Sequence, residues 1–289
     1  MRGSSGGHLV WFTAAFRYNL IEHSRNRFAM LLIVAFVPIW TILAYFFVPE
    51  TAVPFHLNAT GQLLAPAGNR TTQVTGALNA VSLITGFMMF AATFTGGRFD
   101  KRLALAGYPR PHLVLAKAAT LTLASALVAA YATAVIRATW SPQQPLQLAA
   151  ALFSSAMTYG ALGVVFGSVL RREVEGMFAI AMTSIVDITL QHPARSSSAD
   201  RSFVQFLPSH GAIQTATASA FSTTPTPAYL GLQALWFAAI ALLALLTFHR
   251  RTRTALPPAG RHARLAHTGM EVSAAGSSVV ATESINRTV

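Results

Sequence analysis

Hydrophobic positions along this chain gather into six long stretches separated by shorter polar segments. The stretches run from Phe28 to Val48, Ala77 to Gly97, His112 to Ile136, Leu146 to Leu170, Val174 to Gln191 and Ala228 to His249. Each is close to the ~20 residues that an α-helix needs to cross a hydrocarbon layer about 30 Å thick. The pattern predicts an all-α, polytopic membrane protein with six transmembrane helices.

Composition narrows the class of protein. Hydrophobic residues make up 53% of the chain and charged residues only 10%, a balance that would leave a soluble globule with too little polar surface. The net charge of +12 lies in short segments beside the apolar stretches, so we expect no nucleic-acid partner. The chain has no cysteine, and its nine histidines show no His-Glu-x-x-His spacing, so we expect no metal site.

Positive charge divides the loops into two alternating groups. Of the 21 Lys and Arg residues, four lie in the first, third and fifth loops, and these are Arg70, Arg137, Arg195 and Arg201. The other 17 lie before the first stretch, after the sixth, or in the second and fourth loops. Because Lys and Arg beside spans are retained in the cytoplasm, both termini are predicted to be cytoplasmic. Abundant alanine and an excess of Arg over Lys are typical of a GC-rich bacterium, which favours the bacterial plasma membrane.

The segments that flank the spans have different characters. Residues 1–27 carry Leu9, Phe12, Phe16 and Leu20 at helical spacing. We expect a cytoplasmic N-terminal segment with an amphipathic helix on the inner membrane surface. The alternatives are a helical extension of the first span and a loosely ordered leader. Residues 28–249 would form the transmembrane domain, and residues 250–289, which lack periodicity, a disordered cytoplasmic tail.

Asp187 is the acidic residue that lies deep in a predicted span. A carboxylate at mid-depth would cost about 2.5 to 3.5 kcal/mol on insertion scales, so its position needs a reason. One interpretation is a carboxylate that reaches interfacial water or caps a neighbouring helix near Gln191. The other is a role on a substrate path. A single acid does not make a catalytic constellation, and we expect no catalytic residue in this chain.

Two further groups mark contacts. Gly160, Gly163 and Gly167 place small residues on one face of the fourth span, which predicts a close helix–helix contact within the chain or between protomers. Arg171, Arg172, Glu173 and Glu175 crowd the short turn that follows. We interpret this turn as a solvated hairpin with local ion pairs and as a second inner surface for a partner.

The inner loop from Arg98 to Lys117 is the richest in candidate functional residues. Phe99, Leu103 and Leu105 alternate with Asp100, Lys101 and Arg102 in a short helical turn, which Gly107 and Pro109 end just before Arg110. The pattern predicts a rigid, charged knob that projects from the membrane.

At this loop the chain resembles the permease subunits of bacterial type-2 ABC exporters. The family carries an acidic-basic-basic turn, a small residue, a helix breaker and a lysine that begins the third span. Asp100, Lys101, Arg102, Gly107, Pro109 and Lys117 look like these positions, whereas Phe99 departs from the polar residue found in many members. The likeness extends over all six predicted helices, from the N-terminal helix to Leu207-Pro208 in the last outer loop.

The resemblance implies a coupling helix that docks on a separate ABC ATPase subunit, and a second permease copy or a related partner. The chain has no Gly-x-x-x-x-Gly-Lys-Ser/Thr loop, so ATP and Mg would be bound by the partner and not by this chain. Spans lined by Ala, Leu, Phe, Thr and Ser favour a hydrophobic or amphipathic cargo such as a drug, a lipid or a secondary metabolite. The alternatives are an ion-coupled secondary transporter and a non-transporting scaffold or immunity protein.

Overall fold

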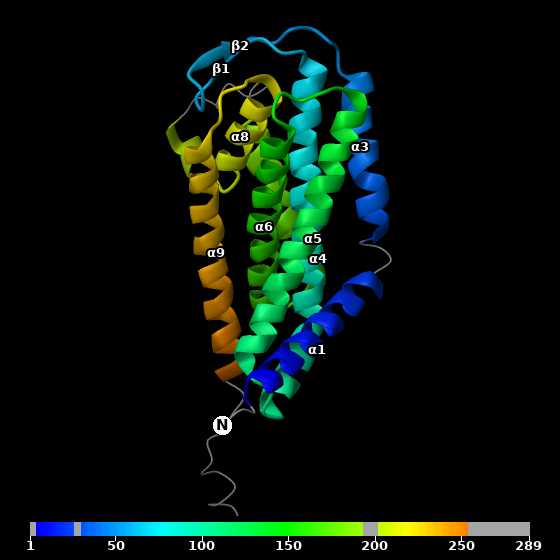
Figure 1. The fold of residues 1–289 in the computed structure, drawn as a ribbon, viewed down its shortest axis with the longest axis vertical. Coiled ribbons are helices and arrows are strands. Elements are labelled where there is room, and N and C mark those ends of the chain that lie inside the picture. The colour runs from blue at the N-terminus through cyan, green and yellow to red at the C-terminus, as the bar shows by residue number, and fades with distance from the viewer. Residues whose placement is uncertain (1–3, 26–29, 193–201, 254–289) are drawn as a thin grey trace, which may run out of the picture. The chain divides into compact units, whose positions relative to one another are not determined.

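The computed structural model describes residues 4–25, 30–192 and 202–253. Its helices are α1 (Ser4–Arg25), the π-helical turn η1 (Leu32–Phe36), α3 (Val37–Phe47), α4 (Gly68–Leu105), α5 (Arg110–Thr139), α6 (Pro145–Val169), α7 (Glu173–Leu190), the 3-10 turn η2 (Ser202–Phe206), α8 (His210–Phe221) and α9 (Pro227–Arg253). Strands β1 (Phe55–Leu57) and β2 (Gln62–Leu64) form an antiparallel hairpin. Helices thus dominate the fold, as predicted, and most of the predicted tail lies outside the described residues (Figure 1).

Four helices among the described residues are long and apolar enough to cross a membrane. They cover Gly68–Gly97 of α4, Arg110–Thr139, Pro145–Val169 and Pro227–Arg250 of α9. A shorter apolar helix covers Ile33–Phe47, and α7 has only 18 residues, including three acids. The prediction of a helical membrane protein is therefore confirmed, with four candidate spans.

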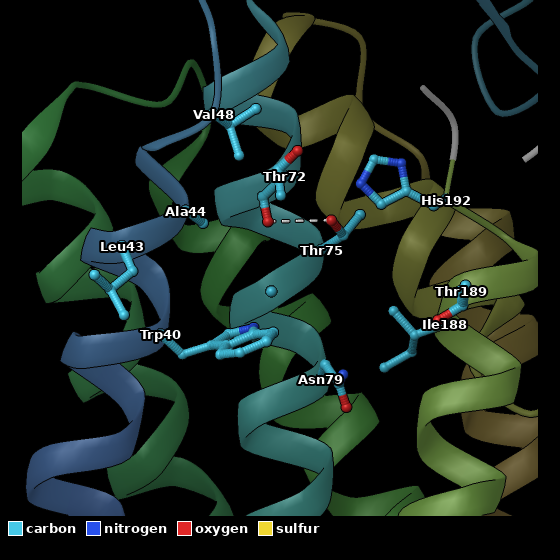
Figure 2. Close-up of a pocket in the computed structure, with 11 residues that line it drawn as sticks. Trp40, Leu43, Ala44, Val48, Thr72, Thr75, Asn79, Ile188, Thr189 and His192 are labelled. Atoms are coloured by element: carbon cyan, nitrogen blue, oxygen red, sulfur yellow. Dashed lines mark hydrogen bonds between the residues drawn. The ribbon is translucent and has the colours of Figure 1, made fainter. Parts of the chain in front are cut away.

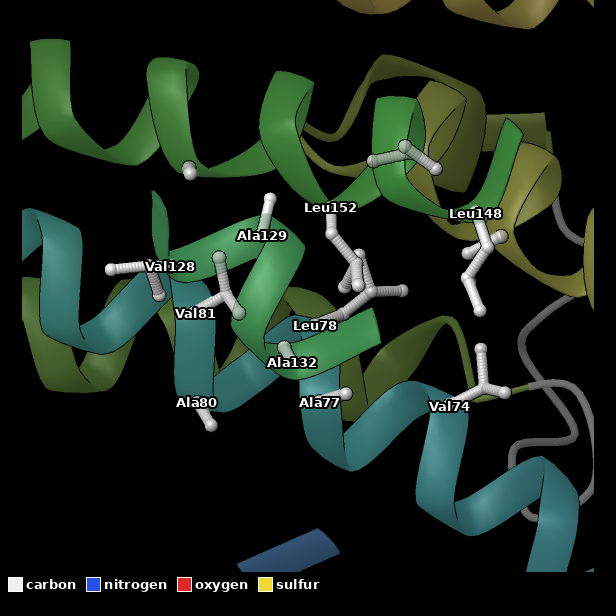
Figure 3. Packing of buried hydrophobic residues seen from close by; sticks show 14 of the residues in the cluster. Val74, Ala77, Leu78, Ala80, Val81, Val128, Ala129, Ala132, Leu148 and Leu152 are labelled. Carbon is white, nitrogen blue, oxygen red and sulfur yellow. The ribbon is translucent and has the colours of Figure 1, made fainter. Parts of the chain in front are cut away.

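Helices α4, α5 and α6 share the main apolar core (Figure 3). Val74, Leu78 and Val81 of α4 are buried against Ala132 of α5 and Leu152 of α6. Small side chains let the helix axes come close. The resulting van der Waals packing stabilises the contact, because the hydrophobic effect is weak between helices in lipid.

The glycines of α6 make the closest of these approaches. A Cβ atom at Gly163 would lie 2.3 Å from the carbonyl oxygen of Gly86, and one at Gly167 would lie 2.9 Å from that of Phe90. Both neighbours are backbone atoms of α4, so only glycine leaves room at these two positions. A Cβ at Gly160 would instead meet the side chain of Leu121 in α5. All three predicted packing glycines therefore lie at contacts within this chain.

Helix α4 begins at Gly68, earlier than the predicted start at Ala77, and ends at Leu105 rather than Gly97. Its added N-terminal turns are polar, yet their donors find partners: the Asn69 side-chain amide donates to the Tyr45 carbonyl oxygen at 3.2 Å. Gln73 accepts a 2.7 Å hydrogen bond from the Trp140 indole. These contacts explain why a polar segment continues the apolar helix, which hydrophobicity alone does not predict.

Pro38 lies in the first turn of α3, directly after the π-helical turn η1. Proline cannot donate a backbone hydrogen bond, and its ring crowds the carbonyl one turn earlier, at Val34. A π-helical turn widens the helix by one residue and so accommodates both defects. The Thr41 hydroxyl then donates back to the Val37 carbonyl oxygen at 2.8 Å.

The connections gather at two ends of the helices (Figure 1). At one end, the β1–β2 hairpin contacts α8, where the Ala59 N–H donates to the Gln214 side chain at 3.1 Å. At the same end, the Gln144 N–H, just before α6, donates to the Ser219 carbonyl oxygen at 2.8 Å. Helix α1 packs beside the junction of α4 and α5 at the other end. We call these the hairpin end and the α1 end.

Candidate functional site

The turn between α4 and α5 occupies the α1 end and contains the predicted coupling residues. Helix α4 closes with backbone hydrogen bonds from the Ala106 N–H to the Arg102 carbonyl and from the Tyr108 N–H to the Leu103 carbonyl, both at 3.0 Å. Gly107 has φ +88, a left-handed conformation that favours glycine and ends many helices. Pro109 precedes the first residue of α5, Arg110. The predicted helical turn that Gly107 and Pro109 end is therefore present, but it continues the preceding helix as the last part of α4.

The three charged residues of this turn have two different environments. Asp100 is buried and its carboxylate accepts a hydrogen bond from the ammonium group of Lys117 in α5. Lys101 and Arg102 are exposed. A buried ion pair whose partner is removed leaves an uncompensated charge, so Asp100 fixes the angle between α4 and α5. Its two neighbours are the side chains that remain available to a partner.

Helix α1 packs against this turn through aromatic side chains. Tyr18 stacks on Phe99 with ring centroids 4.9 Å apart, and Trp11 meets Tyr108 edge to face at 5.0 Å. The Tyr108 hydroxyl also donates to the Trp11 carbonyl oxygen. Ala15 is buried at the centre of the contact with α5. Phe99, the residue that departs from the resembled family, thus faces α1.

Polar groups of α1 continue along α4 into a cavity of about 310 Å³. Its lining includes Glu22 and His23 of α1, Thr95 of α4 and Glu173 of α7. Burial raises the pKa of Glu22, and the Lys117 charge opposes this rise. The ionisation of the Glu22 carboxyl group is thus disfavoured by the fold.

The turn between α6 and α7, which the sequence predicts to be the second inner turn, is more open. Arg171, Arg172, Glu173 and Glu175 are all exposed, and the Arg172 guanidinium lies 3.6 Å from the Glu175 carboxylate. Exposed ion pairs of this kind contribute about 0 to 1 kcal/mol. These charges do not hold the turn in place, and they remain free to meet a partner.

Asp187 lies at the hairpin end of α7, within a buried polar cluster. Its carboxylate accepts hydrogen bonds from the Tyr159 hydroxyl of α6, from the Gln191 amide and, at 3.1 Å, from the backbone N–H of Ser209. Ser209 directly precedes α8, and His210 contacts Gln191 at 2.9 Å. Asp187 therefore has the contacts of a residue that caps a neighbouring helix. Its role on a substrate path stays a prediction.

A cavity of about 350 Å³ opens between α3, α4 and α7 at the hairpin end (Figure 2). Trp40 of α3 reaches across it toward α4 and packs on Gly76. The contact is close: a Cβ atom at Gly76 would lie only 3.0 Å from the indole nitrogen. The polar side chains in a mostly apolar wall are Thr72, Thr75, Asn79, Thr189 and His192. Such a lining suits an amphipathic molecule.

The long-range partners of these residues were not predictable from the sequence. Nothing in the spacing pairs Asp100 with Lys117, or Asp187 with Tyr159 and Ser209. The aromatic residues Trp11 and Tyr18 were also missed as contacts of the inner turn. The sequence did contain one signal for this contact, because aromatic residues occur both in α1 and in residues 98–117.

Comparison with known proteins gives no family assignment. No protein-family model matches the chain, and no curated protein matches it. The resemblance to type-2 ABC permeases therefore stays a prediction, carried by the residues of the inner turn and by the order of the helices.

Proposed function

We propose that the chain is the membrane-spanning permease subunit of an ATP-driven exporter of the type-2 ABC class. It moves a hydrophobic or amphipathic small molecule out of a bacterial cell. A separate ATPase subunit binds ATP and Mg and drives the transport, and a second permease copy or a related chain completes the pathway. This chain is not an enzyme by itself.

The turn between α4 and α5 is the observation that carries this proposal. The exposed residues on the last turns of α4 are Lys101, Arg102 and Leu105. They lie beyond Gly97, where the candidate span in α4 ends. The Asp100–Lys117 ion pair and α1 hold the base of this projection rigidly. A rigid lever with an apolar and cationic tip is what mechanical coupling to a soluble subunit requires.

Helix α7 supports six crossings rather than four. Glu173 at its start lines the cavity at the α1 end with Glu22, whereas Thr189 near its end lines the cavity at the hairpin end with Val48. Its 18 residues span ~27 Å, close to a hydrocarbon thickness of about 30 Å. With α3 as the first span, the arginine-rich turns all fall at the α1 end, which we assign to the cytoplasm.

The cavity between α3, α4 and α7 favours a transport role over a scaffold. Helix α7, whose end lines this cavity, also carries exposed apolar residues such as Phe178 and Met182, which a second permease copy can cover. Two facing cavities would then enclose a path with few fixed charges. An ion-coupled transporter instead needs broken helices that bind the ion near the membrane midplane, and the described parts of α4, α5 and α6 are continuous there.

The decisive test combines isolation of a partner with a change at the tip of the turn. Affinity-purified protein should carry a subunit whose sequence contains a Gly-x-x-x-x-Gly-Lys-Ser/Thr loop. We expect Lys101→Ala with Arg102→Ala to lose that subunit and ATP-driven efflux while insertion and thermal midpoint stay unchanged. Arg171→Ala with Arg172→Ala probes the second inner turn in the same assay.

A matched control separates docking from folding. Arg137→Ala removes an exposed arginine at the hairpin end and should leave both the partner and efflux unchanged. If the Lys101 and Arg102 variant keeps full ATP-dependent efflux, the coupling role is wrong. If efflux follows an ion gradient without ATP, the ion-coupled alternative replaces it.

A further inference from the structure

A third cavity, of about 200 Å³, lies between α5, α6 and α9. Val114, Ala118 and Leu121 of α5 face Phe237, Ala241 and Ala244 of α9 across it. Lys117 is the only charged residue in its lining. An apolar cavity of roughly 150 Å³ is large enough to bind benzene, so this one holds several methylene groups.

Helix α9 is anchored by hydrogen bonds near the hairpin end. Gln233 is buried there: its side-chain oxygen accepts from the Ala212 N–H at 3.0 Å, and its amide donates to the Thr158 hydroxyl at 2.8 Å. Gln147 adds a 2.9 Å hydrogen bond to Thr226, just before the helix. Of the most apolar 18-residue stretch of α9, only 11% is buried. Toward the α1 end, Ile240 is buried and the Phe248 ring lies 6.0 Å from the Lys117 ammonium group, so α9 borders the cavity without filling it.

Positive charge gathers at the α1 end of this cavity. Lys117 contributes an ammonium group with three N–H donors, one of which goes to Asp100. Arg110 precedes Val114 by four residues and Lys117 by seven, so these three lie along one face of α5. The cavity is therefore an apolar slot in a membrane helix bundle, with Lys117 in its lining and a second cation, Arg110, farther along the same face of α5.

We propose that this slot binds an anionic phospholipid. One acyl chain fills the space between α5 and α9, and the phosphate lies beside Lys117 and Arg110. Basic pockets between transmembrane helices bind acidic headgroups in this way. The acyl chain occupies space that the side chains of α5, α6 and α9 leave open. The inference needs α5 and α9 to lie in the membrane, and it is independent of the proposed export function.

Lipid retention tests this site. Purified protein is reconstituted with phosphatidylglycerol or with phosphatidylcholine, washed in detergent and weighed by native mass spectrometry. We expect one phosphatidylglycerol per chain to remain on the wild type, and less phosphatidylcholine. Ala241→Phe and Ala244→Phe fill the slot and should lose the bound lipid.

Ala239→Phe is the matched control, since it makes the same change on an exposed face of α9. It should retain the lipid. Ala118→Phe fills the slot from α5 and serves if the α9 variants do not fold. Arg110→Gln should reduce the preference for phosphatidylglycerol while sparing the Asp100–Lys117 pair.

Three results would overturn the proposal. The wild type retaining no lipid excludes the site, as does equal retention by slot-filling variants and Ala239→Phe. Equal retention of phosphatidylcholine and phosphatidylglycerol removes the role of the two cations. None of these outcomes bears on ATP-driven efflux, so this inference and the proposed function fail separately.

Discussion

At the scale of single residues, Asp187 shows how a buried charge serves the architecture. Tyr159→Phe removes one donor to the carboxylate, and Asp187→Ala leaves the Ser209 N–H and the Tyr159 hydroxyl without an acceptor. We expect Asp187→Ala to cost about 1 to 3 kcal/mol for each group left unsatisfied. In a double-mutant cycle, Asp187 and Tyr159 should couple by roughly 0.5 to 3 kcal/mol. Unfolding in detergent measures both quantities.

The same cycle separates capping from transport. Thr122→Val changes an exposed hydroxyl of α5 that bonds only within its own helix, and it should be nearly neutral. Asp187→Asn with unchanged expression and full efflux would remove Asp187 from the substrate path and leave the cap. Additive effects of Asp187 and Tyr159 would contradict the hydrogen bond between them.

Glu22 gives a pH dependence with a defined sign. Because burial raises its pKa above the ordinary value of 4.5, the fold prefers the protonated form. Its contribution to stability is therefore present below pH 4.5 and is lost as the pH rises through the raised pKa. Glu22→Gln should match the wild type at acid pH and exceed its thermal midpoint near neutrality. Lys117, Asp100 and His23 interact with this carboxyl group and are unchanged in the variant.

The comparison of melting curves is direct. The difference in thermal midpoint between Glu22→Gln and the wild type should grow as the pH rises from acid to neutral. Parallel curves would mean that burial of Glu22 does not disfavour its charge. Because α1 carries this residue, we expect α1 to pack more stably at acid pH than at neutral pH.

At the scale of elements, the contact between α4 and α6 depends on missing side chains. Gly163→Ala would place a methyl group 2.3 Å from the Gly86 carbonyl oxygen, so one helix must move. Overpacking of this kind costs about 1 to 3 kcal/mol. Gly160→Ala should cost less, because it meets the end of the Leu121 side chain. Thermal unfolding in detergent ranks the two variants.

Gly231→Ala is the matched control for this series. No atom lies within 4 Å of a Cβ at Gly231 in α9, and alanine favours the helix more than glycine does. We expect a gain of at most about 1 kcal/mol. A neutral Gly163→Ala would mean that α4 and α6 can separate without loss.

Helices were predictable because each apolar stretch is a local feature, and the end of α4 was predictable because Gly107 and Pro109 stop a helix chemically. The β1–β2 hairpin was not predicted, since its burial comes from α8, far away in the chain. The Asp100–Lys117 pair and the cap at Asp187 depend on how helices face one another. A single sequence does not carry that information, and neither does it fix where α1 lies.

At the scale of the whole molecule, the two candidate topologies make opposite predictions for the connecting turns. Six crossings place Gly61 and Ser141 outside the cell, and Gly107 and Arg171 inside. If α3 and α7 do not cross, the chain has four spans and all four positions change sides, although both termini stay in the cytoplasm. The position of the termini therefore cannot distinguish six spans from four, but the turns can.

Cysteine labelling can locate these turns directly. The chain contains no cysteine, so no native cysteine has to be replaced first. Single cysteines at Asn58, Ser141, Ala106 and Arg171 are exposed sites in these turns for a membrane-impermeant maleimide, and they leave Gly61 and Gly107, which have positive φ, in place. In intact cells we expect the first two to react and the last two to react only after permeabilisation. The reverse pattern would place the α4–α5 turn outside, where an ATPase subunit cannot reach Lys101 and Arg102. Coupling to ATP would then be impossible for this chain, whatever its fold.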